Sequence, residues 1–308
     1  MPSANQIEKT SDCLIIGAGP AGLVAAIYLS RYRRSVRLFD SGESRAMNIP
    51  LSHNVAGFPD GISGVDLLER LRLQAQNAGV VIEKAKINKL EKTPQYFIAN
   101  VGNRQIKSYS VLLAAGAIDN VTPANLPIEA TWNGQVRWCP VCDGYESTDR
   151  TVVLIGEARQ GVEHALFLRT YTRELSLVIP QDRGALGRTG RQQLKSAGIK
   201  LIEKSPEHAT FSKPETGNQL HFSDGSSLAF DVLYPMTGGH ARSSLATGMG
   251  VRCDKHGAIK VGAGQQTSIR GLYAAGDVVC SLKQISVAVS EGAIAATAIH
   301  GKLPPNFR

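Results

Sequence analysis

The hydrophobic positions at the start of the chain form a short apolar run, a glycine-rich turn and an alanine-rich stretch. Residues 13–16 are continuously apolar, which is typical of a parallel strand buried on both faces. The stretch 23–32 predicts a helix, and the run 36–39, which ends at Asp40, predicts a second strand. Together these segments predict a βαβ unit of about thirty residues, the size of a Rossmann half.

The segments that follow alternate between loop, helix and strand. Residues 41–64 contain glycines and prolines with little periodicity, so we predict a long loop, and long loops inside a domain are usually functional. Residues 65–78 carry apolar side chains at helical spacing and predict an amphipathic helix. The segment 110–113, which meets a turn at 114–117, predicts another strand.

The strand–turn–helix pattern occurs again in the middle of the chain. An apolar run at 151–155 precedes a glycine-containing turn at 156–161, a helix through residue 168 and a strand at 175–179. We therefore expect two nucleotide-binding units in one chain, as duplication of a Rossmann-type domain would produce.

The last part of the chain returns to the pattern of the first unit. A strand at 231–235 is followed by a glycine pair at 238–239, a final strand at 271–275, and a helix at 285–300 that we expect to end at Gly301. The length of 308 residues also indicates two domains.

These patterns predict an α/β fold with two Rossmann-like nucleotide-binding domains of the three-layer ββα type. We expect residues 1–117 and 240–308 to form one discontinuous domain. Residues 118–239 are then a smaller domain inserted between its two parts.

The first turn matches a dinucleotide-binding loop, GxGxxG. Gly17 permits the tight turn, Gly19 lets backbone amides approach a pyrophosphate, and Gly22 lets the helix pack close to the strand. The helix N-terminus attracts the pyrophosphate, and Asp40 is placed to accept hydrogen bonds from a ribose. The alternative, a glycine-rich turn without a ligand, leaves the carboxylate after the second strand unexplained.

Charge and hydropathy exclude several classes of partner. The formal net charge is +8, but the basic residues are dispersed and no nucleic-acid-binding motif accompanies them. We therefore expect no nucleic acid partner, whereas an acidic protein partner stays open. The chain has no run of 18 apolar residues and no apolar signal core, so we expect a cytoplasmic protein that does not enter the membrane.

Of the five cysteines, only Cys139 and Cys142 are close in sequence. A second CxxC is missing, so we predict no metal site. In the cytoplasm a close pair is more often redox-active than structural, because one thiolate can attack a disulfide and the other can resolve it. Half a metal site or two structural cysteines are the alternatives. We predict that Cys13 and Cys280 are buried as small apolar residues, and assign no role to Cys253.

Three motifs carry a resemblance that spans essentially the whole chain. The strings 15–22 and 272–278 resemble the two FAD signatures of pyridine-nucleotide-disulfide oxidoreductases. The string Cys-Pro-Val-Cys-Asp-Gly at 139–144 resembles the active site of low-molecular-weight thioredoxin reductases. The resemblance implies bound FAD, a homodimer, and a disulfide or dithiol substrate, either a thioredoxin-like protein or a small thiol.

The resemblance also implies roles for individual residues. Cys142 is the flavin-proximal, charge-transfer sulfur, Cys139 meets the substrate disulfide, and Asp143 carries a proton to or from the pair. Asp277 lies at the ribityl-phosphate region and Asn54 near the flavin ring. The FAD-binding residues implied in this way are Gly17, Ala18, Gly19, Pro20, Ala21, Gly22, Asp40, Asn54, Gly116, Gly276, Asp277, Lys283, Gln284 and Ile285, of which 283–285 replace the family's usual Arg-Gln.

The second dinucleotide-like loop departs from the family. Ala158 stands where the middle glycine is expected, and its Cβ obstructs close approach to a pyrophosphate. Glu157 and Glu163 disfavour an anion, although Arg183 and Arg188 follow later. We therefore expect NADPH to be a poor or absent donor, and resemblance to NADPH-independent relatives offers ferredoxin or a second FAD instead.

Three other functions stay open. The chain could be an ordinary NADPH-dependent thioredoxin reductase. It could be an oxidase of a small dithiol, although such relatives tend to place His where Asp143 stands. It could also be a non-catalytic, redox-sensing flavoprotein.

Overall fold

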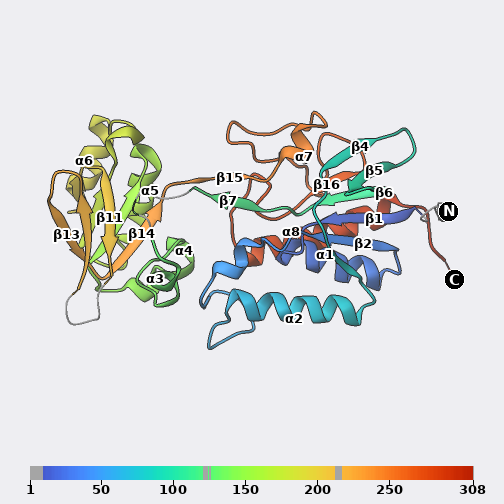
Figure 1. The fold of residues 1–308 in the computed structure, drawn as a ribbon, viewed down its shortest axis with the longest axis horizontal. Coiled ribbons are helices and arrows are strands. Elements are labelled where there is room, and N and C mark those ends of the chain that lie inside the picture. Colours follow the sequence, from blue (N-terminus) through green and yellow to red (C-terminus); the bar gives the residue numbers. More distant parts are fainter. Residues whose placement is uncertain (1–9, 121–123, 125, 212–216, 308) are drawn as a thin grey trace. The chain divides into compact units, whose positions relative to one another are not determined.

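The structure is a computed structural model that describes residues 10–120, 124, 126–211 and 217–307. The chain divides into two compact units, shown in Figure 1. Unit 1 comprises residues 1–51, 55–118 and 240–308, and unit 2 comprises residues 52–54 and 119–239. Both units contain parallel sheets of Rossmann type, which confirms the predicted α/β fold class.

Unit 1 is built on a seven-stranded sheet. The first βαβ segment has the predicted order, and β1 pairs in parallel with β2 on one side and with β6 on the other. Two further strands, β3 and β16, extend the parallel part, whereas β5 and β4 continue from β6 as an antiparallel edge. The strands are β1 (Ser11–Ile16), β2 (Val36–Asp40), β3 (Ile82–Lys84), β4 (Lys89–Lys92), β5 (Phe97–Val101), β6 (Arg104–Leu113) and β16 (Leu272–Ala274).

Three helices lie together on one side of this sheet in Figure 1: α1 (Pro20–Arg31), α2 (Gly64–Asn77) and α8 (Ile285–Lys302). Helix α8 crosses α1 so closely that a Cβ on Gly292 would lie 2.3 Å from the carbonyl oxygen of Ala21. A side chain at residue 292 would therefore push the helices apart. The segment after β2 is mostly loop, as predicted, with one short helical turn, η1 (Arg45–Asn48).

Helix α8 is longer than predicted. It runs through Gly301 to Lys302, and the following Leu303 is already extended. Gly301 does not adopt the left-handed conformation that would end a helix there. The prolines at 304 and 305 set the end instead, since the residue before a proline disfavours the helical conformation.

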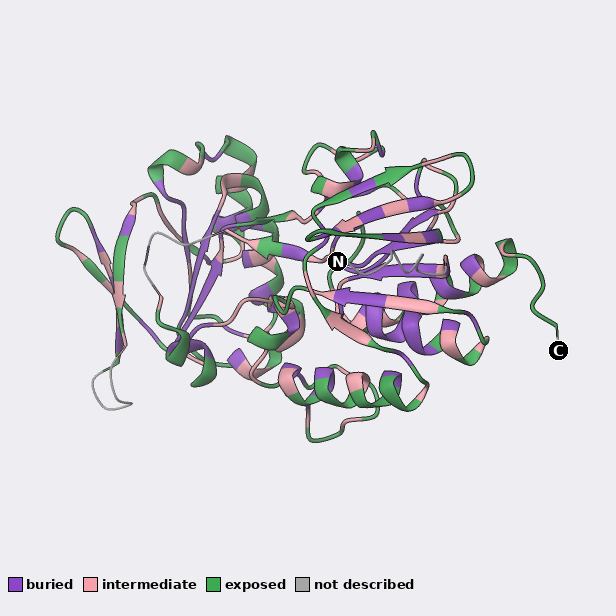
Figure 2. Ribbon diagram, turned by 45° about the vertical axis from the view of Figure 1, so that its right-hand side comes forward, coloured by how far each residue is buried: buried purple, intermediate pink, exposed green. Residues whose placement is uncertain are grey.

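Unit 2 contains a four-stranded parallel sheet in the order β10-β9-β8-β14 and a three-stranded antiparallel sheet. Figure 2 shows that the buried residues of both units gather on the strands and on the inner faces of the helices. The elements are α3 (Ile128–Trp132), α4 (Pro140–Asp143), η2 (Tyr145–Ser147), β8 (Val152–Gly156), α5 (Ala158–Leu168), β9 (Leu175–Val178), η3 (Gln181–Arg183), α6 (Arg188–Ser196), β10 (Lys200–Ile202), β11 (Pro206–Thr210), β12 (Asn218–Phe222), β13 (Ser227–Phe230) and β14 (Val232–Met236).

The chain passes between the units through two paired strands, β7 (Ala117–Asp119) and β15 (Gly239–Ala241). Next to them, the Asn120 amide donates to the carbonyl of Gly238 at 3.0 Å. Within the described part of the chain, every helix is too short or too polar to span a bilayer.

Candidate active site

The glycine loop of unit 1 connects β1 to α1 in the geometry of a dinucleotide-binding turn. Gly17 has a φ of +107°, and its amide donates to the carbonyl of Phe39 at 2.8 Å. A Cβ on Gly17 would lie 2.3 Å from the carbonyl oxygen of Ala114, and one on Gly22 would lie 1.9 Å from that of Gly17. Both positions therefore exclude side chains, as the sequence pattern requires.

The middle of this loop is open where a ligand would approach. A Cβ on Gly19 would meet, among the described residues, only the Ser44 hydroxyl oxygen within 4 Å, at 3.4 Å. Gly19 caps α1 without a side-chain hydrogen bond, and Pro20 begins the helix. The first turn of α1 carries no acidic residue. These features fit the diphosphate of a dinucleotide, because the helix N-terminus offers positive partial charge to an anion.

Asp40 lies at the carboxyl end of β2, as the dinucleotide-binding pattern of the sequence predicted. One carboxylate oxygen accepts a hydrogen bond from the Ala18 amide at 3.4 Å, and the other pairs with Arg72 at 3.2 Å. The side chain of Asp40 is only 12% exposed. The sequence did not identify Arg72, although its place in the amphipathic helix 65–78 made it a candidate.

The second FAD-like string lies beside the first in unit 1. Gly276 has a φ of +79°, and a Cβ there would lie 3.0 Å from that of Ala21 in the first turn of α1. The Gly276 amide donates to the buried carboxylate of Glu291 at 2.7 Å. Asp277 pairs with Arg45 of η1 at 3.1 Å. The sequence did not predict Arg45, which lies in the loop with little periodicity.

The remaining predicted FAD residues are spread over loops. Gly116 has a φ of +74° and follows β6, and Asn54 accepts a hydrogen bond from the Ser52 hydroxyl at 2.9 Å. Lys283 is exposed, and Gln284 caps α8 directly before Ile285. The structure therefore brings together the loop 17–22, Asp40, Gly276 and Asp277.

The cysteine pair forms the disulfide Cys139–Cys142 at the start of α4 in unit 2. Cys139 caps this short helix, and the Cys142 amide approaches its sulfur at 3.1 Å. Pro140, as the first helical residue, lacks the amide hydrogen that would have no partner there. Both cysteines are partly exposed, so this local turn presents a redox-active type of disulfide to its surroundings.

Asp143, at the end of α4, points into a polar cluster of unit 2. Its two carboxylate oxygens lie 3.0 Å from the Tyr234 hydroxyl and 3.5 Å from the Arg137 guanidinium. Burial raises the pKa of the Asp143 carboxyl to about 6, and the positive charge of Arg137 opposes this rise. The sequence identified Asp143 only, because nothing near Tyr234 in the chain indicates this contact.

The second dinucleotide-like loop has the same connection but a different lining. Gly156 and Gly161 approach closely, since a Cβ on Gly156 would lie 2.9 Å from the Gly161 Cα. Glu157 caps α5, and its carboxylate pairs with Arg183 at 3.4 Å. Gly184 also lies near the Cβ of Ala158. The segment after β9 therefore contacts the first residues of α5 through Arg183 and Gly184.

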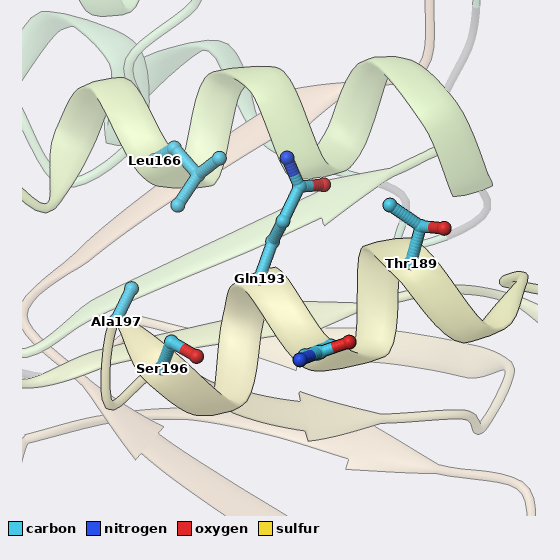
Figure 3. Close-up of a pocket in the computed structure, with 6 residues that line it drawn as sticks. Leu166, Thr189, Gln193, Ser196 and Ala197 are labelled. Atoms are coloured by element: carbon cyan, nitrogen blue, oxygen red, sulfur yellow. The ribbon is translucent and has the colours of Figure 1, made fainter.

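A surface groove between α5 and α6, shown in Figure 3, contains none of the predicted site residues. Leu166 reaches it from α5, and the other lining residues come from α6 and the residue after it: Thr189, Gln192, Gln193, Ser196 and Ala197. Across the described residues, no three His, Cys, Asp or Glu side chains are grouped to hold a metal ion.

Of the two predictions made for the other cysteines, one is confirmed and one is wrong. Cys13 is fully buried in β1, as predicted, and burial raises the pKa of its thiol to about 12. Cys280 is exposed, so its predicted burial is wrong. The apolar core ends one residue earlier at Val279, and the chain then turns outward before α8. Cys253 is partly buried.

Comparison with known proteins gives concordant matches. The model of the pyridine nucleotide-disulphide oxidoreductase family matches residues 11–292. A 34.2 kDa protein of the rubredoxin operon of Clostridium pasteurianum is 29% identical, over 94% of this chain and 96% of that protein. A thioredoxin reductase of Peptoclostridium acidaminophilum is 27% identical, over 98% and 99%. The fold resembles that of thioredoxin reductase from Streptococcus pyogenes, with a TM-score of 0.85, 24% identity, and coverage of 95% and 97%.

Proposed function

The chain belongs to the pyridine nucleotide-disulphide oxidoreductase family and is an FAD-dependent disulfide oxidoreductase of the thioredoxin reductase type, and we propose that Cys139 and Cys142 are its redox pair and that its electron donor is not NADPH. The first part of this proposal depends on the partly exposed disulfide at the start of α4. The second part depends on the altered loop before α5.

When bound, FAD would carry the two electrons that reduce the disulfide. Two electrons and two protons break the Cys139–Cys142 bond and give two thiols. The Cys139 thiolate then attacks a substrate disulfide, and Cys142 attacks the resulting mixed disulfide, which re-forms the internal bond and releases the reduced substrate. Asp143, next to Cys142 in the chain, exchanges a proton with the pair, which is a role for a carboxyl whose pKa lies near neutrality.

Unit 1 holds the FAD in this proposal. The amides at the start of α1 bind the diphosphate, and Asp40 binds the adenosine ribose. Asp277 lies beside the same helix turn, and alone its carboxylate would repel a diphosphate. Arg45 pairs with Asp277 and offsets that charge, which supports an FAD site here. Asn54, Gly116 and residues 283–285 keep the roles that the family resemblance implies.

Unit 2 disfavours NADPH for reasons of charge and space. The Cβ of Ala158, directly after the cap of α5, obstructs the approach of a diphosphate to the helix N-terminus, and the pair of Glu157 with Arg183 leaves no net positive charge at this cap. Arg183 is engaged with Glu157 and with the neighbouring Asp182, rather than being presented to a 2′-phosphate. A ferredoxin fits the excess of basic residues in the chain, and a second FAD is the other donor that we propose.

An NADPH-dependent thioredoxin reductase is the alternative. The retained pair Gly156 and Gly161 favours it, since these glycines still allow the tight strand-to-helix turn. A thioredoxin-like protein or a small thiol is the substrate in either case, and we propose that the protein acts as a cytoplasmic homodimer.

Anaerobic titration tests the donor. We expect NADPH to leave the flavin absorbance of the purified protein unchanged, while dithionite bleaches it fully. Rapid bleaching by NADPH would establish the alternative. The FAD released per chain by denaturation then separates the two proposed donors, because a ratio near one excludes a resident second FAD. Reduced ferredoxin should bleach the flavin if it is the donor.

A further inference from the structure

The Asp143 carboxyl is held by residues that come from separate parts of unit 2. The segment before α4 runs alongside β14, where Val136 bridges to Leu233 in parallel and the Arg137 amide donates to the Leu233 carbonyl at 2.9 Å. This pairing places Arg137 next to Tyr234 in space. Helix α4 follows and carries Asp143 to the same place.

Each carboxylate oxygen has its own partner. The Tyr234 hydroxyl lies 3.0 Å from Oδ1 and 3.1 Å from the main-chain carbonyl oxygen of Asp143, and Arg137 Nη1 lies 3.5 Å from Oδ2. The Ser147 hydroxyl lies 2.9 Å from that of Tyr234, and both residues are completely buried. Because Tyr234 has one hydroxyl hydrogen, donating it to Asp143 leaves Ser147 to donate to Tyr234. Ser147, Tyr234 and Asp143 thus form a chain of hydrogen bonds.

The charges around the carboxyl oppose one another. Burial and the carboxylate of Glu146 in η2 favour its neutral form, whereas Arg137 and Tyr234 favour its ionised form. Helix α5 also packs against α4, and its titratable residues are His164, which is partly buried, and Arg159 and Glu163, which pair with each other. The protonation of Asp143 therefore depends on contacts that lie outside the CxxC turn.

We propose that Tyr234 and Arg137 are positioning residues that hold the carboxyl of Asp143, the residue directly after Cys142, and govern its proton exchange with Cys139 and Cys142. This inference rests on the proposed function of the cysteine pair. One proton moves in this exchange. A neutral Asp143 gives it to a thiolate, which becomes a thiol, and the carboxylate remains paired with Arg137 and Tyr234. Removing either partner destabilises the carboxylate, so proton release then requires a higher pH.

The test is the pH dependence of the rate at which iodoacetamide alkylates Cys139. The full-length protein is first reduced with dithiothreitol, and mass spectrometry measures the alkylation of Cys139. The variants are Tyr234→Phe, Arg137→Gln and Asp143→Asn. Tyr171→Phe is the matched control, because it removes a hydroxyl from a ring that packs against Gly144 at the end of α4. This assay needs no donor and no substrate disulfide.

We expect the wild-type profile to contain an acid-range transition that disappears in Asp143→Asn. In Tyr234→Phe it should move up by about one pH unit, the size expected for losing a hydrogen bond to a charged group. Arg137→Gln should move it in the same direction, and Tyr171→Phe should match the wild type.

Profiles of Tyr234→Phe and Arg137→Gln that overlay the wild type overturn the inference, as does a transition that persists in Asp143→Asn. If the variants behave as expected but no donor gives disulfide turnover, the proposed function fails and the positioning inference stands. If turnover occurs and the profiles overlay, only the positioning inference fails.

Discussion

The two strand–turn–helix loops of this protein share a connection and differ in the residues at the start of their helices. In unit 1, Gly17 is left-handed, Gly19 leaves space before α1, and the first helical turn carries no acid. In unit 2, Gly156 is not left-handed, and Ala158 follows a capping glutamate. The glycines that pack helix against strand are kept in both.

This difference distinguishes the loop residues that serve folding from those that serve ligand binding. The first and third glycines of each loop serve helix–strand packing, which both units need. The middle position and the charge at the helix cap serve only a diphosphate, which approaches the exposed end of the helix. A substitution at the middle position or at the cap can therefore alter nucleotide binding while the Rossmann-type unit keeps its fold, because fold and site depend on different residues.

The largest effect is expected from adding one methyl group at the third glycine of unit 1. In Gly22→Ala, the new Cβ would lie 1.9 Å from the Gly17 carbonyl oxygen, so the loop must move. We expect the variant to lose FAD on gel filtration and to be destabilised by about 3 kcal/mol in urea unfolding.

Gly161→Ala is the matched control in unit 2. Its Cβ would meet the end of the Leu177 side chain at 3.1 Å, which can shift, so we expect a cost of about 1 kcal/mol and normal FAD content. Equal loss of FAD in both variants would contradict the contrast between the loops.

A second change tests whether the loop before α5 limits the use of NADPH. The double variant Glu157→Gly with Ala158→Gly removes the carboxylate from the cap of α5 and the Cβ from the residue after it. We expect NADPH to reduce its flavin at least about tenfold faster than that of the wild type, which corresponds to about 1.4 kcal/mol. Stopped-flow absorbance measures this rate.

Glu207→Gln controls for the loss of a negative charge in the same unit, since Glu207 is exposed and lies on β11, outside the second loop and α5. It should leave the NADPH response unchanged. An unchanged response of the double variant would show that the helix cap is not what limits NADPH.

A smaller effect is expected at the helix N-terminus of unit 1. Arg45→Met removes the cation that pairs with Asp277, and we expect FAD to bind up to about tenfold more weakly. Fluorescence titration of the apoprotein measures this affinity. Arg104→Met, which breaks a more exposed pair with Glu83 in the same unit, should bind FAD normally. Equal affinities for both variants would leave Arg45 with a structural role alone.

Local patterns predicted the elements that depend on near neighbours in the chain. The runs 13–16 and 36–39 became β1 and β2, and the periodic stretch 65–78 became α2 within one residue at each end. These predictions succeeded because burial of a whole strand or of one helix face leaves a repeating signal. The predicted burial of Cys280 was wrong, because it depends on where the core stops. The predicted end of α8 at Gly301 was wrong, because the prolines at 304 and 305 set it instead.

The sequence by itself determined the glycine loop and the CxxC turn. The glycine pattern and the Cys-Pro-Val-Cys spacing specify these turns, because only certain residue types allow their backbone conformations. Only the tertiary structure decided which side chains surround these turns. Arg45 reaches Asp277 across 232 positions of sequence, and Tyr234 reaches Asp143 across 91. Such pairs leave no periodic signal in one chain, because sheet order and helix packing, not sequence spacing, bring them together.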